Sequence, residues 1–76
     1  MLRKTPPKEG FIATLRRVPR ASETRWMDAE GNRLYTWDGL HGELEVFTQR
    51  GYHLGAVRPT DGKFVKRAVK GRKIDV

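Results

Sequence analysis

Hydrophobic and polar side chains alternate over short runs along most of this chain, and residues typical of turns separate the runs. Alternation with a period of two residues is the pattern of a β-strand. It predicts strands at residues 23–27, 33–38, 43–48, 52–57 and 64–69. The turns between them include residues 28–32, 49–51 and 59–62, each of which contains a glycine. Short strands joined by tight turns indicate a strongly twisted antiparallel meander.

The residues before these strands follow a different pattern. Residues 1–10 are polar, include two consecutive prolines and predict an extended basic arm. The apolar residues at positions 11, 12, 15 and 18 share one face of a helix, which Pro19 would end at Val18. A strand over the same residues is the alternative. We therefore expect one small domain over residues 11–76, mainly β within the α+β class, with about five strands and a short N-terminal helix.

The expected core is small, because 76 residues allow only one domain. The chain contains no cysteine, so its fold depends on packing and not on disulfides or a thiolate metal site. A sheet of this size is expected to leave one face open to solvent. The apolar positions of the predicted strands give the core as Trp26, Leu34 or Tyr35, Trp37, Leu44, Val46, Leu54, Val57, Phe64 and Val65.

Charge is distributed unevenly along the chain, which carries a net charge of +7. Residues 1–20 hold six basic side chains against one acidic, residues 58–73 hold seven against one, and residues 21–57 hold three against six. Two basic segments thus flank an acidic centre. Such a charge on so short a chain favours contact with a polyanion, and nucleic acid is the first candidate. A solvated surface is the simpler interpretation.

No apolar run approaches the roughly 20 residues that a transmembrane helix needs. The first residues also lack the apolar segment of a secretory signal. We therefore expect a soluble domain that is made in a cytoplasm or is a piece of a larger protein.

The acidic centre contains four titratable groups within eight residues. If the chain is extended from His41 onward, His41, Glu43 and Glu45 point to one face, while the leucine and valine between and after them point to the other. One face then carries an imidazole and two carboxylates, which a strand does not need for stability alone. The whole stretch reads Trp37-Asp38-Gly39-Leu40-His41-Gly42-Glu43-Leu44-Glu45.

Two kinds of chemistry suit these groups. Imidazole and carboxylates are ligands for zinc or manganese. On an extended strand, however, the Cα atoms of His41 and Glu45 lie about 13 Å apart at ~3.4 Å per residue, too far to chelate one ion. We therefore expect no metal site.

The same separation of His41 and Glu45 fits cleavage of RNA, in which a base takes the 2′-hydroxyl proton and an acid protonates the leaving 5′-oxygen. An arginine from elsewhere would stabilise the transition state.

Structural roles stay open for the same residues. Asp38 is suited to capping the turn at Gly39, and the two glutamates are suited to a solvated strand face. His53 is suited to packing beside its neighbours. A His41/His53 acid–base pair is a further alternative.

At these residues the sequence resembles the cytotoxic ribonuclease domain of the ribosome-inactivating nuclease colicins, the cloacin type. The run Trp-Asp-x-x-His-Gly-Glu-Leu-Glu at residues 37–45 carries most of the resemblance, which extends from Arg25-Trp26 to Arg72-Lys73-Ile74. The sequence departs from the family in a slightly shorter turn before His53, in Phe47 where tyrosine is expected, and in residues 11–22, which have no clear counterpart.

The resemblance implies a small, highly twisted antiparallel sheet with a short N-terminal helix. It implies cleavage of 16S ribosomal RNA at the decoding site without metal or cofactor, which blocks translation. The implied partners are the ribosome as substrate and an acidic immunity protein as inhibitor, with no membrane insertion by this domain. The domain would act in the bacterial cytoplasm as the C-terminal part of a secreted or cell-surface toxin.

The resemblance also assigns residues by position. Glu45 is expected to be the base and His41 the acid, although the two roles can be exchanged. The catalytic set is Asp38, His41, Glu43, Glu45 and Arg72. The residues expected to bind RNA are His53, Phe47, Lys66, Lys70 and Lys73, with Phe47 open to stacking on a splayed base. Two other functions stay open: a non-catalytic RNA- or ribosome-binding β module, and a general ribonuclease that acts on free RNA.

Overall fold

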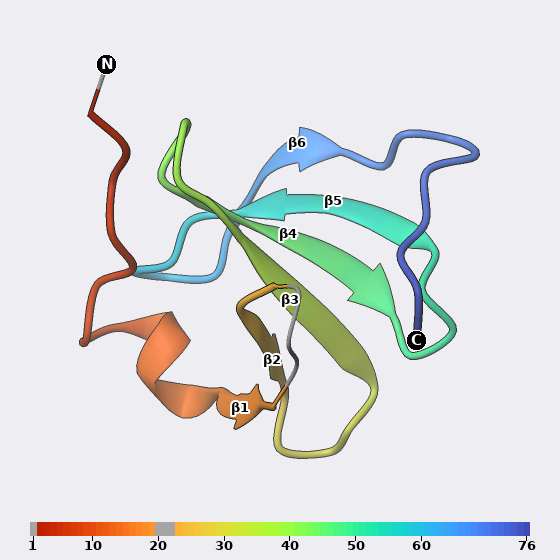
Figure 1. Cartoon of the computed structure of the whole chain (residues 1–76), viewed down its shortest axis with the longest axis horizontal. Helices are drawn as coiled ribbons and strands as arrows, with labels where there is room; N and C mark the ends of the chain where they lie inside the picture. Colours follow the sequence, from red (N-terminus) through yellow and green to blue (C-terminus); the bar gives the residue numbers. More distant parts are fainter. Residues whose placement is uncertain (1, 20–22) are drawn as a thin grey trace.

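The structure, a computed structural model, describes residues 2–19 and 23–76. Within these residues six strands form one antiparallel sheet, in which each strand pairs with the next along the chain (Figure 1). The predicted antiparallel meander is confirmed, with six strands in place of about five. Met1 and residues 20–22, which include Arg20 of the first basic segment, lie outside the described residues. The strands are β1 (Arg16–Val18), β2 (Arg25–Met27), β3 (Arg33–Asp38), β4 (Glu43–Thr48), β5 (His53–Val57) and β6 (Phe64–Arg67).

The segment 11–18 is divided between the two predicted alternatives. Phe11–Thr14 form a short 3-10 helix, η1, and the chain is extended from Leu15 into β1. The prediction of one helix over the whole segment is therefore wrong. Backbone N–H groups of Phe11 and Ile12 donate to the carbonyls of Thr60 and Pro59 at 2.8 and 2.9 Å, and β1 pairs with β2. These tertiary contacts override the helical periodicity. Within the described residues, no helix is long and apolar enough to cross a membrane.

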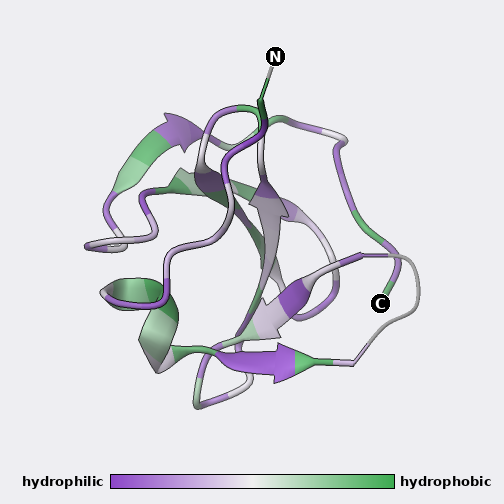
Figure 2. Cartoon of the chain, turned by 60° about the vertical axis from the view of Figure 1, so that its left-hand side comes forward, coloured by the Kyte–Doolittle hydropathy of each residue, from purple (hydrophilic) through white to green (hydrophobic). Residues whose placement is uncertain are grey.

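The core lies between one face of the sheet and η1. The ring of Phe11 meets Tyr35 edge to face, with centroids 5.7 Å apart. Figure 2 shows η1 beside the sheet, with β1 mostly hydrophilic at the edge. The buried cluster consists of Ile12, Trp26, Tyr35, Leu44, Val46 and Val57, and Phe11, Leu15, Trp37 and Leu54 pack against it.

The sequence misplaced four apolar side chains. Phe64 and Val65, expected in the core, are 49% and 43% exposed. They lie on β6, the edge strand, where a register irregularity against β5 breaks the alternation. Conversely, Phe47 and Ala56 are fully buried although the sequence did not place them in the core.

The expectation of one solvent-exposed face is wrong at the centre of the sheet, although a cleft opens on that face. In β4 the four consecutive residues 44–47 are all buried, so both faces are covered there. The C-terminal segment, residues 68–76, runs beside the start of β5 (Figure 1), and its Arg72 side chain reaches Glu45 on the second face. His53 N–H donates to the Arg72 carbonyl at 3.0 Å, and Ile74 N–H donates to the Gly51 carbonyl at 2.8 Å. This segment therefore completes the fold and places Arg72 over the sheet.

Replacing Leu44 by alanine should lower the free energy of unfolding by about 3 kcal/mol, because its fully buried side chain leaves a cavity in a thin core. The matched change Val65→Ala, at an exposed edge position, should cost less than about 1 kcal/mol. Urea unfolding followed by tryptophan fluorescence measures both values. Equal losses in the two variants would contradict the burial described above.

Candidate active site

The pairing of the strands places one charged residue at the centre of the second face. Residues directly opposite each other in an antiparallel sheet point to the same face. Glu45 on β4 lies opposite Thr36 on β3 and Ala56 on β5, and these lie opposite Arg25 on β2 and Lys66 on β6. Glu45 therefore lies between two cationic side chains of one row, each two strands away, and the row continues from Arg25 to Val18 on β1.

Asp38 and His41 form a hydrogen-bonded pair at one end of this face. Asp38 ends β3, and its Oδ1 accepts the backbone N–H groups of Leu40 at 3.0 Å and His41 at 3.2 Å. Its Oδ2 lies 2.7 Å from Nδ1 of the imidazole. His41 thus sits in the turn of residues 39–42, and the expectation of an extended chain from His41 is wrong, because β4 begins at Glu43. The His41 side chain is 52% exposed.

The turn also sets the protonation of this pair. Burial of Asp38 raises its pKa, but hydrogen bonds from the ring and backbone of His41 outweigh that effect and hold the pKa below its usual value. The carboxylate is therefore ionised near neutral pH and can only accept, so Nδ1 of His41 carries the shared proton. Nε2 is the other ring nitrogen, through which the imidazole could exchange a proton with a ligand.

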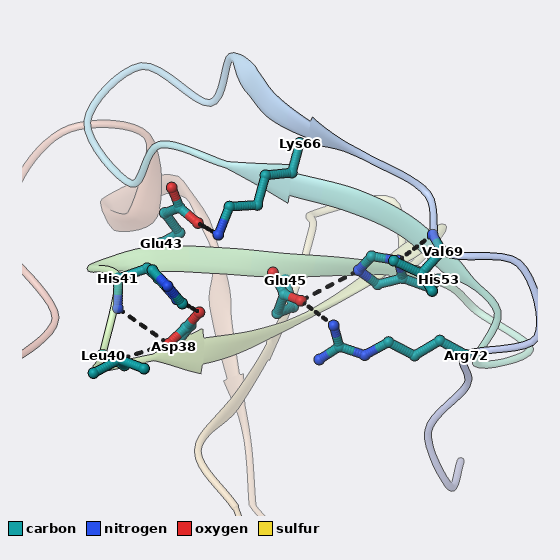
Figure 3. Close-up of polar contacts among 9 residues, drawn as sticks. All are labelled: Asp38, Leu40, His41, Glu43, Glu45, His53, Lys66, Val69 and Arg72. Atoms are coloured by element: carbon teal, nitrogen blue, oxygen red, sulfur yellow. Dashed lines mark hydrogen bonds and ion pairs between the residues drawn. The ribbon is translucent and has the colours of Figure 1, made fainter.

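Glu45 is held by groups from the C-terminal half of the chain. Its Oε1 lies 2.6 Å from Nη1 of Arg72 and 3.3 Å from Nε2 of His53 (Figure 3). The His53 contact is a close approach without the alignment of a hydrogen bond. The Glu45 side chain is only 10% exposed, and a carboxylate so buried requires compensating partners. Arg72 is 47% exposed, so its guanidinium can also reach a ligand.

His53 is fixed in a single orientation. The backbone N–H of Val69 donates to its Nδ1 at 2.9 Å, so a neutral ring carries its proton on Nε2, facing Glu45. The ring of Phe47 packs edge to face against it, with centroids 5.2 Å apart. Its side chain is only 2% exposed and Phe47 is fully buried. The expected stacking of Phe47 on a base is therefore wrong, because this ring is fully buried. His53 is nearly buried but lines the cleft beside Glu45.

Glu43 and Lys66 form an ion pair across the sheet. Lys66 Nζ lies 2.9 Å from Oε1 of Glu43 (Figure 3). The hydrogen bond to Glu43 raises the pKa of Lys66, so its ammonium persists well above neutral pH. Glu43 is the more covered partner, with 18% of its side chain exposed against 47% for Lys66. The carboxylate therefore orients a cation that stays accessible.

Most of these groups line one cleft of about 480 Å³, but Glu43 and Phe47 are not part of its lining. In Figure 3 the Asp38–His41 pair lies at one end, Glu45 in the middle and Arg72 at the other end. His41 and Glu45 thus open onto the same cleft rather than onto opposite surfaces of the sheet. Lys70 and Lys73, two of the expected RNA contacts, lie outside its lining; Lys73 Nζ is 5.9 Å from the ring of Tyr52. The predicted site residues that line the cleft are Asp38, His41, Glu45, His53, Lys66 and Arg72.

One group of side chains has the spacing of a metal site. Donor atoms of Asp38, His41 and Glu43 all lie within 4.8 Å of one another. The imidazole Nδ1 is already bonded to Asp38, and Glu43 is paired with Lys66. An ion that used these two atoms would compete with both contacts. The pair weighed from the sequence, His41 with Glu45, is not part of this group.

Sequence reasoning missed three basic residues at the site. Arg3 and Arg67 line the cleft, and no local pattern marks either of them. Arg25 is 2% exposed and donates to the carbonyl of Asp75 at 2.8 Å and to Glu23 at 2.6 Å, so it anchors the C-terminal segment that carries Arg72. The register of β2 against β3 would have revealed Arg25, because Arg25 lies opposite Thr36 in the row of Glu45.

Comparison with known proteins supports the resemblance that the sequence indicated. The family model described as Cytotoxic matches residues 3–75. Over 60 residues the chain is 40% identical to cloacin, 37% to colicin E6 and 35% to colicin E3, all from Escherichia coli. Each alignment covers 78% of this chain and 11% of the relative, so the chain matches only a small part of these proteins. A match over nearly the whole described chain shows that it belongs to the Cytotoxic family.

Proposed function

We propose that this domain is a bacterial toxin ribonuclease that cleaves 16S ribosomal RNA at the decoding site and so blocks translation. The observation that carries the proposal is the cleft, onto which Glu45 and the Asp38–His41 pair open together with the cations of Lys66 and Arg72. The substrate follows from the resemblance to the ribosome-inactivating nuclease colicins. The net charge of +7 favours a polyanionic substrate.

The arrangement suits acid–base cleavage across one phosphate. Glu45 takes the proton of the 2′-hydroxyl, whose oxygen then attacks the phosphorus. The bond from phosphorus to the 5′-oxygen breaks, and Nε2 of His41 gives its proton to that leaving oxygen. The products are a 2′,3′-cyclic phosphate and a 5′-hydroxyl. The reverse assignment of acid and base uses the same two groups.

Arg72 has a double role in this proposal. Without substrate its guanidinium pairs with the Glu45 carboxylate at 2.6 Å. When a phosphate enters, the planar guanidinium exchanges the carboxylate for the phosphate oxygens, for which its geometry is suited. The Glu45 carboxylate is then released from this ion pair and can accept the proton of the 2′-hydroxyl. Lys66, oriented by Glu43, supplies a second cation for the same transition state.

The partners follow from the same reasoning. The ribosome is the substrate, so the site of action is the bacterial cytoplasm, which the domain would reach as part of a secreted or cell-surface toxin. An acidic immunity protein is the inhibitor implied by the resemblance, and the basic surface favours such a partner. A non-catalytic RNA-binding module is the alternative, but carboxylates in the cleft would repel phosphate without any gain.

The variants His41→Ala and Glu45→Ala should each slow cleavage by at least about 100-fold, because each removes one proton-transfer group. Primer extension across the decoding region of 16S RNA, after exposure of intact ribosomes, measures the new 3′ end. Lys8→Ala, an exposed change away from the cleft, is the control and should cleave normally. Cleavage at the wild-type rate by either cleft variant would rule out its role. Equal cutting of naked RNA and ribosomes would favour the general ribonuclease.

Asp38→Asn should slow cleavage by about 100-fold or more, and by the same factor at pH 5 and pH 8. The pKa of Asp38 lies below its usual value of 3.8, so its charge contributes at every pH above that value and is lost only as the pH falls through the lowered pKa. The ratio of wild-type to variant rates across this range is the measurement. A ratio that shrinks toward one at pH 5 would mean that Asp38 titrates there.

Addition of EDTA should leave the cleavage rate unchanged, since the donor atoms of Asp38, His41 and Glu43 already have partners within the protein. The enzyme alone is treated with EDTA. Magnesium is then restored, so that the ribosomes stay intact during the assay. A loss of activity that zinc or manganese reverses would assign these three residues to a metal site.

A further inference from the structure

The N-terminal arm lies against the turn that carries His41. Lys4 N–H donates to the Gly39 carbonyl at 2.8 Å, and the indole N–H of Trp37 donates to the Lys4 carbonyl at 2.8 Å. Both backbone polar groups of Lys4 are therefore bonded to the end of the β3–β4 hairpin. The sequence alone predicted only an extended polar arm. In the structure, the arm is a fixed part of the site.

Two glycines of the turn make room for this contact. A Cβ atom on Gly42 would lie 2.7 Å from Cδ of Lys4, so the lysine side chain lies directly across the turn beside His41. A Cβ atom on Gly39 would lie 3.2 Å from the Lys4 carbonyl and 3.4 Å from Cβ of Arg3. The side chains of Arg3 and Lys4 thus begin at the catalytic turn, and Arg3 lines the cleft.

The cations of the arm differ from those already assigned to catalysis. Lys66 and Arg72 are paired with Glu43 and Glu45 at 2.9 and 2.6 Å. In the part of the chain that the structure describes, neither Arg3 nor Lys4 has an ion-pair partner, and both are exposed. Unpaired cations held at the rim of a cleft are available to an anion without the loss of an internal contact.

We propose that Arg3 and Lys4 form a second phosphate-binding element of the active site, which holds the RNA strand on the His41 side of the cleaved bond. This inference rests on the proposed function. Because His41 protonates the leaving 5′-oxygen, the phosphate held by the arm is the one that follows the cleaved linkage. Anchoring it keeps the leaving oxygen within reach of Nε2. Arg3 and Lys4 bind substrate and take no part in proton transfer.

The test compares two double variants that remove the same charge. Arg3→Gln/Lys4→Gln removes the proposed element, and Lys8→Gln/Lys63→Gln removes two exposed cations that do not line the cleft. Cleavage of intact ribosomes is followed over a range of ribosome and KCl concentrations. The first variant should raise KM about tenfold with kcat changed less than about twofold. The slope of log KM against log salt should fall by about 1.4, because each of the two lost phosphate contacts to a single strand contributes about 0.7.

Equal shifts of KM and of the salt slope in the two double variants would overturn the proposal, because the arm would then contribute only general charge. A fall in kcat with KM unchanged would also overturn it, since the arm would then only hold the turn in place. If the wild-type domain cuts no ribosomal RNA, the proposed function fails and takes this inference with it. If the wild type cuts and the variants match each other, only the arm proposal fails.

Discussion

The ion pair between Glu45 and Arg72 joins the C-terminal segment to the centre of the sheet. A carboxylate with 10% of its side chain exposed, at the centre of a sheet only six short strands wide, needs compensation for its lost hydration. Arg72 provides it at 2.6 Å, and His53 adds a close Nε2 contact. Since Arg72 lies on the C-terminal segment, the charge of Glu45 and the path of that segment depend on each other.

The surrounding structure can be understood as support for this interaction. A register irregularity after Val46 lets His53 lie opposite Phe47, whose ring supports the imidazole. Bulges near active sites often redirect a side chain in this way. Val69 N–H fixes the imidazole from the other side, and the buried Arg25 holds the carbonyl of Asp75 farther along the tail. Edge strands, the bulge and the tail thus serve a site on a face that the sequence predicted to be open.

Local pattern was enough to predict the hairpin that carries the site. Residues 33–38 and 43–48 form strands with the predicted bounds, because alternation and the turn chemistry of Asp38-Gly39 are encoded within a few residues. The resemblance over residues 37–45 then named Asp38, His41 and Glu45, which line one cleft. The covering of Glu45 could not be predicted, since it depends on contacts such as Val69 with His53 and Arg25 with Asp75, which lie 16 and 50 residues apart. The exposure of Phe64 likewise depends on its edge position, and not on its own chemistry.

The central claim is that the two proton-transfer groups act on RNA through its 2′-hydroxyl, across one phosphate. Chemical analysis of the RNA ends tests it most directly. After exposure of ribosomes to the domain, the account predicts a 2′,3′-cyclic phosphate on the upstream fragment and a 5′-hydroxyl on the downstream fragment. A 3′-hydroxyl and a 5′-phosphate would mean that water attacked the phosphorus, and would contradict the roles given to His41 and Glu45.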